Sequence, residues 1–248
     1  MMPIRRLALG ALALPLTLAI AACGSESTGT AELNGEPIEP IAAPAGESWN
    51  DTATVTPEGG VQVGNPEAPL KLVEYASHTC PTCARFSVDA HTALEEYIAT
   101  GVVSFEIRNQ VHDVLDLTFS ILARCGDPST FHPLAVQGWA DLNTIIMTAQ
   151  GNEAALNAAM QEQGPDRFQL VGEASGLVDW FAARGIARDQ AMQCLADGAQ
   201  AQTIVENSQT QSEELGVTGT PTFFLNGSKL EGSAWSAIEP KLQEAGAR

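Results

Sequence analysis

The pattern that most constrains the fold is a cysteine pair, Cys80 and Cys83, between an apolar strand and a long helix. The mostly apolar run 70–75 indicates a buried strand. From about Cys80 to Thr100, apolar residues recur at helical spacing, and the alternating run 102–108 predicts a second strand. Two strands joined through a helix with a short return are typical of a parallel βαβ unit.

The rest of the domain adds a helical region and a second sheet segment. Residues of about 113–214 form helical patterns broken at Gly and Pro. A strand follows at 222–225, a hairpin turn at 226–227 and a returning strand at 229–231. A last helix is expected over 233–246. The predicted class is α/β, in the order βαβ, helical insert, ββα.

The first residues have the pattern of a secretory signal. Arg5 and Arg6 precede the apolar run 7–19, and small residues lead to Cys23. This run is too short for a durable transmembrane helix. The ending resembles the lipobox of bacterial lipoproteins, which implies removal of residues 1–22 and lipidation of Cys23. The alternative is a soluble secreted protein whose signal ends near a cysteine by chance.

A spacer and one domain are expected after the signal. Residues 23–60 are rich in small and polar residues without periodicity, which predicts a flexible tether. The domain should cover 61–248, opening with a short edge strand at 61–63 and carrying the insert at about 113–214. The formal net charge of -18 argues against nucleic-acid binding.

The placement of Cys80 at a helix start has chemical consequences. Free N–H groups and the helix dipole stabilise a thiolate there, and such motifs lower cysteine pKa values to roughly 3.5–7. Cys80 is therefore the expected nucleophile, and Cys83, one turn inward, the resolving cysteine. Pro81 suits the first helical turn. A zinc half-site would need about four ligands, and a purely structural disulfide across so short a loop would add little stability.

These features together resemble a known family. The strand, Cys80-Pro-Thr-Cys83, the helix, the insert and Gly219-Thr220-Pro221 before a hairpin resemble the DsbA-like branch of the thioredoxin superfamily over 61–246. The resemblance implies a thioredoxin fold with a large helical insertion and thiol–disulfide oxidoreductase activity without cofactor or metal. It also implies a cis Pro221 opposite Cys80, with Thr220 pairing to an extended substrate.

Other residues of the domain carry expectations of their own. Many thioredoxin-like proteins carry a buried acid six residues before the first cysteine, which is Glu74 here. It would exchange a proton with Cys83, unless it is a solvent-facing strand residue. His78 would line the substrate groove or add positive charge near Cys80, or else belong to a surface loop. His112 and His132 are expected to pack or cap within the insert.

Thr82 departs from the best-known oxidases of the family, which have histidine at that position. With Pro81, Thr82 should lie at the substrate-binding surface. Threonine lacks the histidine charge that helps to stabilise the thiolate. We therefore expect a potential less oxidising than in those members, yet above the roughly −270 mV of thioredoxin.

Cys125 and Cys194 are the other two cysteines of the domain. Some related DsbA-like proteins carry a second disulfide in this region, which implies that these residues pair. Chain entropy predicts a stabilisation of about 4 kcal/mol for the closed loop. The alternative is two buried free thiols.

The expected function is dithiol oxidation of exported proteins. A reductase or isomerase remains open, and so does a copper-binding or partner-binding module using Cys80, Cys83 and His78. The expected partners are reduced or unfolded exported proteins, a redox partner that recharges the site and a membrane bound through lipid. We expect a monomer on the extracytoplasmic side of a bacterial membrane.

Overall fold

A mixed sheet forms the centre of the protein, whose computed structural model describes residues 35–248. The strands described there are β1 (Ala53–Val55), β2 (Val61–Gly64), β3 (Leu70–Ala76), β4 (Val103–Asn109), β5 (Thr222–Leu225) and β6 (Ser228–Lys229). Their order is β1-β2-β4-β3-β5-β6. Strands β3 and β4 are parallel, as predicted, and every other neighbouring pair is antiparallel. The expected signal peptide 1–22, Cys23 and the start of the tether lie outside the described residues.

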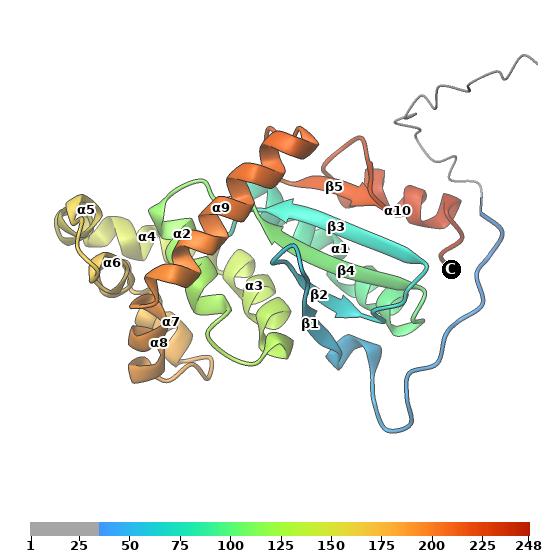
Figure 1. Ribbon diagram of the computed structural model, residues 1–248, viewed down its shortest axis with the longest axis horizontal. Coiled ribbons are helices and arrows are strands. Elements are labelled where there is room, and N and C mark those ends of the chain that lie inside the picture. Colours follow the sequence, from blue (N-terminus) through green and yellow to red (C-terminus); the bar gives the residue numbers. More distant parts are fainter. Residues whose placement is uncertain (1–34) are drawn as a thin grey trace, which may run out of the picture.

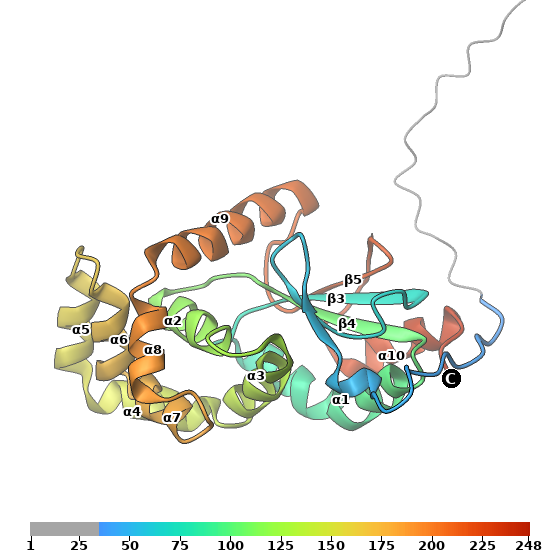
Figure 2. The same cartoon turned by 60° about the horizontal axis from the view of Figure 1, so that its bottom comes forward.

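Helices α1 (Pro81–Ala99) and α10 (Trp235–Glu244) cover one face of the sheet (Figures 1 and 2). The ring of Phe86 on α1 lies 4.4 Å from that of Phe223 on β5 and 6.1 Å from that of Trp235 on α10, between ring centroids. This aromatic contact holds α1 against β5 and α10. The start of α1 lies at the carboxyl end of β3 because the helix follows that strand directly in the sequence.

Local sequence explains the limits of α1. Cys80 is its N-cap residue and Pro81 occupies the first turn, where no backbone N–H is needed. Phe86, Ala90 and Leu94 are buried at helical spacing. Gly101 follows the helix with a φ of 71°, a left-handed conformation that favours glycine.

The helical insert agrees with the predicted range. Its helices are α2 (Val114–Ala123), α3 (Phe131–Ala140), α4 (Leu142–Gly151), α5 (Glu153–Gln161), α6 (Arg167–Ala174), α7 (Leu177–Ala182), α8 (Arg188–Leu195) and α9 (Gly198–Leu215), with a 3₁₀ turn at Pro128–Thr130. Figure 1 shows α4 to α8 beyond the end of the sheet, with α9 running back toward β5. Phe119 packs against Trp180 and Phe181 in the core of the insert. None of the helices described is long and apolar enough to cross a lipid bilayer.

The structure does not agree with a flexible tether over residues 35–60. A 3₁₀ turn (Trp49–Asp51) and strand β1 lie in this range, and β1 pairs with β2. Upstream, the Gly35 N–H donates to the Glu244 carbonyl at 2.7 Å and the Ile41 N–H donates to the Thr100 carbonyl at 2.8 Å. This order could not be predicted from the polar, aperiodic sequence, because it depends on backbone hydrogen bonds to the rest of the domain.

Strand β2 also differs from the expected edge strand. Its four residues are buried, and it lies between β1 and β4. The three-residue strand β1 forms the edge instead and has two exposed residues. A strand this short and exposed carries almost no periodic signal, so the sequence did not reveal it.

Candidate active site

Cys80 and Cys83 lie at the start of α1, and both are free thiols. The Cys80 Sγ atom accepts a hydrogen bond from the Cys83 backbone N–H at 3.5 Å. Cys80 is 7% exposed to solvent and Cys83 is 0% exposed. The expected geometry is therefore present, with an outer cysteine at the helix end and an inner one that is closed off from solvent.

The two thiols have opposite acidities. A hydrogen bond from the Cys83 thiol, helped by Thr220 and by the backbone N–H groups of Cys83 and Thr82, lowers the pKa of Cys80 to about 5 despite its partial burial. Burial raises the pKa of Cys83 far above its ordinary value, and the hydrogen bond to Cys80 adds to the effect. At neutral pH, Cys80 is a thiolate and Cys83 keeps its proton.

Thr220 and Pro221 lie against Cys80. The Cys80 Sγ atom is 3.4 Å from the Thr220 carbonyl oxygen, to which its thiol donates in the protonated form. The Thr220–Pro221 peptide bond is cis, as the family resemblance implied. Thr222, the first residue of β5, pairs with Tyr75 on β3. Pairing of β5 with β3 thus places Thr220 beside a cysteine that follows β3.

Glu74 is buried within β3, not on a solvent-facing surface. It is 1% exposed, and within residues 35–248 neither carboxyl oxygen has a hydrogen-bond partner. Burial raises its pKa well above 4.5, and the negative charge of Cys80 raises it further. A cavity of about 340 Å³ lined by Phe86, Phe105 and Trp139 reaches Glu74. Burial thus favours the protonated form of the carboxyl group, which could give up its proton when the charge nearby changes.

Pro81 and Thr82 form the outer surface of the cysteine pair. Pro81 is exposed, and Thr82 is half-buried. The Thr82 backbone N–H contributes to the low pKa of Cys80. The backbone at this position therefore helps to stabilise the thiolate, although the side chain brings no charge.

His78 is neither a surface residue nor a source of positive charge. It is 3% exposed, and its ring lies between those of Phe119 and Trp139, at 4.5 and 5.3 Å between centroids. Burial lowers its pKa to about 3. A neutral ring adds no positive charge near Cys80, so the expectations of a charge and of a surface loop were both wrong. The aromatic pocket that buries it is assembled from the insert and is not visible in the local sequence.

The other two histidines of the insert differ from each other. His132 packs against Phe105, as expected, and its Nε2 atom lies 2.8 Å from the Val61 carbonyl oxygen. His112 is exposed, and its Nε2 atom lies 3.2 Å from the Thr220 hydroxyl. The prediction of a packing or capping role for the His112 side chain is thus wrong, because strand pairing brings Thr220 to it from 108 residues further along the chain.

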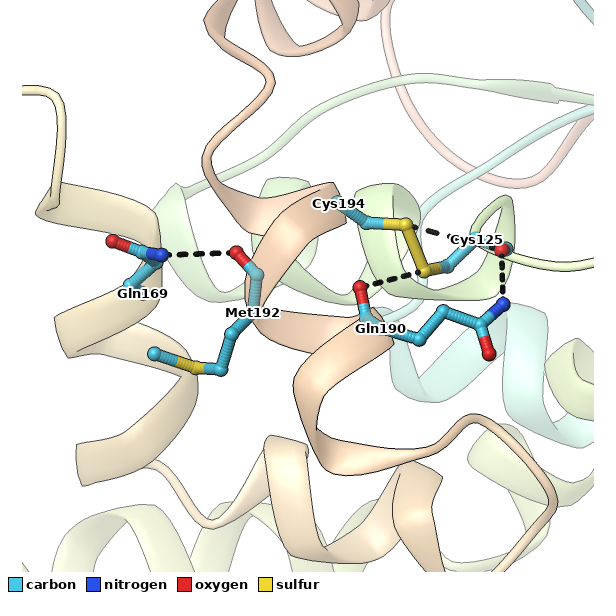
Figure 3. The surroundings of a disulfide bond; sticks show 5 residues. All are labelled: Cys125, Gln169, Gln190, Met192 and Cys194. Carbon is cyan, nitrogen blue, oxygen red and sulfur yellow. Dashed lines mark hydrogen bonds between the residues drawn. A yellow bond between two sulfur atoms is a disulfide. The ribbon is translucent and has the colours of Figure 1, made fainter.

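Cys125 and Cys194 form a disulfide, as the family resemblance implied (Figure 3). It joins the turn after α2 to α8, and its Cα atoms are 5.8 Å apart. The Gln190 side-chain amide donates to the Cys125 carbonyl at 2.8 Å beside the bond. The alternative of two free thiols is thereby excluded, and the disulfide fastens two helices of the insert together.

No group of three His, Cys, Asp or Glu side chains that could hold a metal ion occurs in the part of the chain from residue 35 onward.

The geometry of the cysteine site agrees with the known proteins to which this sequence is similar. A thioredoxin family profile, Thioredoxin_4, matches residues 56–243, and the chain therefore belongs to the thioredoxin family. The "Putative protein-disulfide oxidoreductase" of Rickettsia bellii is 27% identical over 190 residues, covering 76% of this chain and 65% of that protein. A protein of the same description from Rickettsia typhi is 29% identical over 185 residues, covering 74% and 60%. The chain thus spans less than two thirds of the length of these relatives.

Solved structures share the fold. The protein-disulfide isomerase from Novosphingobium aromaticivorans superposes with a TM-score of 0.68 at 28% identity, covering 73% of this chain and 94% of that one. The alpha-DsbA1 protein of Wolbachia pipientis superposes with a TM-score of 0.61 at 21% identity, covering 80% and 96%. The thioredoxin fold with a helical insertion is therefore that of DsbA.

Proposed function

We propose that this protein is a DsbA-like thiol–disulfide oxidoreductase that oxidises dithiols in exported proteins through Cys80 and Cys83. One observation carries the proposal: Cys80 has a pKa of about 5, while the thiol of Cys83 is fully buried behind it. Stabilising the Cys80 thiolate favours the dithiol form, and a disulfide whose reduced form is stabilised is an oxidant.

The exchange takes two steps. A thiolate of the client attacks Sγ of Cys80 in the Cys80–Cys83 disulfide, forming a mixed disulfide and releasing Cys83 as a thiolate. The second client thiolate then attacks the client sulfur of the mixed disulfide. This step forms the client disulfide and releases Cys80 as a thiolate. Two electrons pass from the client dithiol to the protein. In the reductive direction, the Cys80 thiolate attacks a client disulfide and Cys83 resolves the intermediate.

Glu74 has a place in the first step. The released Cys83 sulfur is buried, where a negative charge is costly. The buried carboxyl of Glu74 interacts electrostatically with Cys83, and burial raises the pKa of Glu74, which favours its protonated form. Transfer of its proton to Cys83 removes the thiolate charge, and the reverse transfer prepares Cys83 to close the disulfide.

The client binds beside Thr220 in this proposal. An extended client segment pairs with the backbone next to Pro221 and passes over Pro81 and Thr82. A mainly backbone contact suits many unfolded sequences, because it depends little on side chains. The family resemblance and the proximity of Thr220 to Cys80 support this arrangement.

Rates with a reduced model protein test the direction of exchange. The oxidised protein should form disulfides in reduced ribonuclease faster than glutathione disulfide does, and Cys80→Ala should abolish this rate. Faster reduction of insulin than oxidation of ribonuclease would indicate a reductase, and recovery of scrambled ribonuclease would indicate an isomerase. Tight Cu(I) binding with no exchange in any assay would favour the copper-binding alternative.

A redox titration against glutathione tests the oxidising character. The expected potential of the Cys80–Cys83 pair lies above the roughly −270 mV of thioredoxin and below that of relatives with histidine in place of Thr82. A value at or below that of thioredoxin would contradict a role as an oxidant.

The proposed location is the outer side of a bacterial membrane, with a lipid on Cys23. The sequence pattern at 7–23 supports this. One acyl chain anchors only marginally, so at least two are needed for stable attachment. Mass spectrometry of the N-terminal peptide from membranes should find acylated Cys23, and Cys23→Ser should release the protein from the membrane fraction.

A further inference from the structure

We propose that His112 is a positioning residue that holds Thr220, and thereby the client-binding backbone, in register with Cys80. This inference rests on the proposed function. The observation that supports it is a path around the cysteine made of hydrogen bonds and the short stretches of backbone between them. The Cys80 thiol contacts the Thr220 carbonyl at 3.4 Å, and the Thr220 hydroxyl contacts His112 at 3.2 Å. The remainder of the path returns from His112 to Cys80 through buried groups.

Asp116 forms the buried part of this path. It is 1% exposed, and its carboxylate accepts the backbone N–H of His112 at 2.9 Å and that of His78 at 2.8 Å. Next to His78, the Ser77 carbonyl accepts the Cys80 N–H at 3.2 Å and the Trp139 indole N–H at 3.0 Å. One carboxylate therefore joins the loop that carries His112 to the loop that leads into the cysteine pair.

The backbone before α2 is fixed at three successive residues. The Gln110 N–H donates to the Ala76 carbonyl at 2.8 Å, the Val111 N–H donates to the Ser208 hydroxyl at 2.8 Å, and the His112 N–H donates to Asp116. The backbone that carries His112 is therefore held in place. The imidazole extends from this fixed backbone to Thr220, a residue that lies in a loop.

Thr220 needs such a contact. It is half-buried and follows the exposed residues Thr218 and Gly219, and regular strand pairing of β5 begins only at Thr222. The backbone of Thr220 is thus outside the sheet, although the proposed client pairs with it. The bond to His112 limits its movement relative to Cys80. Loss of that bond should weaken client binding more than it slows the chemical step, because the sulfur atoms are unchanged.

A double-mutant cycle tests the contact. The oxidation of a synthetic peptide with two cysteines is followed for the full chain and for His112→Ala, Thr220→Val and the double variant. Each single variant should raise KM roughly threefold to tenfold, the range expected for the loss of one hydrogen bond. His112→Ala should leave kcat nearly unchanged, whereas Thr220→Val can also change kcat because Thr220 helps to lower the Cys80 pKa. The double variant should be no worse than Thr220→Val alone, because Thr220→Val already removes the contact with His112.

Two further variants separate position from charge. His112→Gln keeps a hydrogen-bonding side chain without a positive charge and should restore most of the lost binding. His91→Ala removes another exposed histidine, on α1, and should leave KM unchanged. The Cys80 pKa, measured by thiolate absorbance, should be the same in the wild type, His112→Ala and His112→Gln.

The outcomes distinguish this inference from the function on which it rests. Absence of peptide oxidation by the wild type would overturn the proposed function itself. Normal wild-type turnover with additive effects of His112→Ala and Thr220→Val would overturn only the positioning role. A His112→Gln variant as impaired as His112→Ala would also overturn the positioning role. A rise in the Cys80 pKa large enough to explain the weaker client binding of His112→Ala would do the same.

Discussion

The Sγ atom of Cys80 lies 3.4 Å from the carbonyl oxygen of Thr220, a residue 140 positions further along the chain. The helical insert lies between the two in sequence, yet β3 and β5 are neighbours in the sheet. The reactive sulfur and the backbone proposed to bind the client are therefore held together by strand pairing. This arrangement allows the insert to form the surroundings of the site without separating its two halves.

The first prediction concerns the intermediate. Cys83→Ala leaves Cys80 as a lone reactive thiol, so a mixed disulfide with a client cannot be resolved within the protein. We expect covalent adducts on non-reducing gels that disappear with dithiothreitol, and none with Cys80→Ala. Adducts that persist in Cys80→Ala but not in Cys83→Ala would show that the roles of the two cysteines are reversed.

The second prediction concerns pH. The pKa of Cys80 is lowered from 9.0 to about 5, so alkylation of the reduced protein by iodoacetamide should rise through pH 5 and then level off by about pH 7. Because the folded pKa is the lower one, the contribution to stability is complete above pH 9 and is lost as the pH falls through 5. Reduced wild type should therefore gain stability over Cys80→Ser as the pH rises between these values.

A midpoint of alkylation near pH 9 would contradict the thiolate. The oxidised protein is the control for the stability measurement, because a disulfide has no ionisable thiol. Cys80→Ser cannot form the disulfide, so it has no oxidised form to compare. The control is therefore the oxidised wild type alone, whose stability should lack this rise with pH.

The third prediction concerns Glu74. Its buried carboxyl has a pKa raised above 4.5, so it favours the unfolded state increasingly as the pH rises past 4.5 toward the folded value. Glu74→Gln removes this penalty and should raise the free energy of unfolding, more at pH 8 than at pH 4. It should also slow exchange, because an amide cannot transfer the proton.

Stopped-flow rates of mixed-disulfide formation, together with denaturant unfolding at both pH values, check this prediction. Equal rates for wild type and Glu74→Gln across the pH range would exclude proton transfer. Glu96→Gln, on the exposed surface of α1, is the matched control and should change neither quantity.

The fourth prediction concerns the disulfide between Cys125 and Cys194. Replacing both residues with serine opens a loop with a sequence separation of 69 and should cost about 4 kcal/mol of unfolding free energy. The bond lies in the insert between α2 and α8, so alkylation of Cys80 should keep its pH midpoint. Denaturant unfolding measures the first effect. A double variant as stable as the wild type would show that the bond has no role in stability.

Local patterns determined much of the fold. The limits of α1 follow from the N-cap cysteine, Pro81 and the glycine after the helix, all of which act within one turn. The Asn226-Gly227 turn is equally local, with φ values of 49° and 80° that these residues adopt readily. The position of the cysteine pair at the start of the helix could therefore be predicted from the sequence alone, and the family resemblance supplied Pro221.

Only the tertiary structure decided how side chains from distant segments face one another. Glu74 could not be assigned to a face because its strand is apolar on both sides: Val73 and Tyr75 pack against Val217 and Phe224, which leaves Glu74 pointing to the face under α1. His112 meets Thr220 because β5 returns beside β3. Periodicity reports burial along one segment, whereas these contacts depend on which segments pair, and that is fixed only when the whole sheet forms.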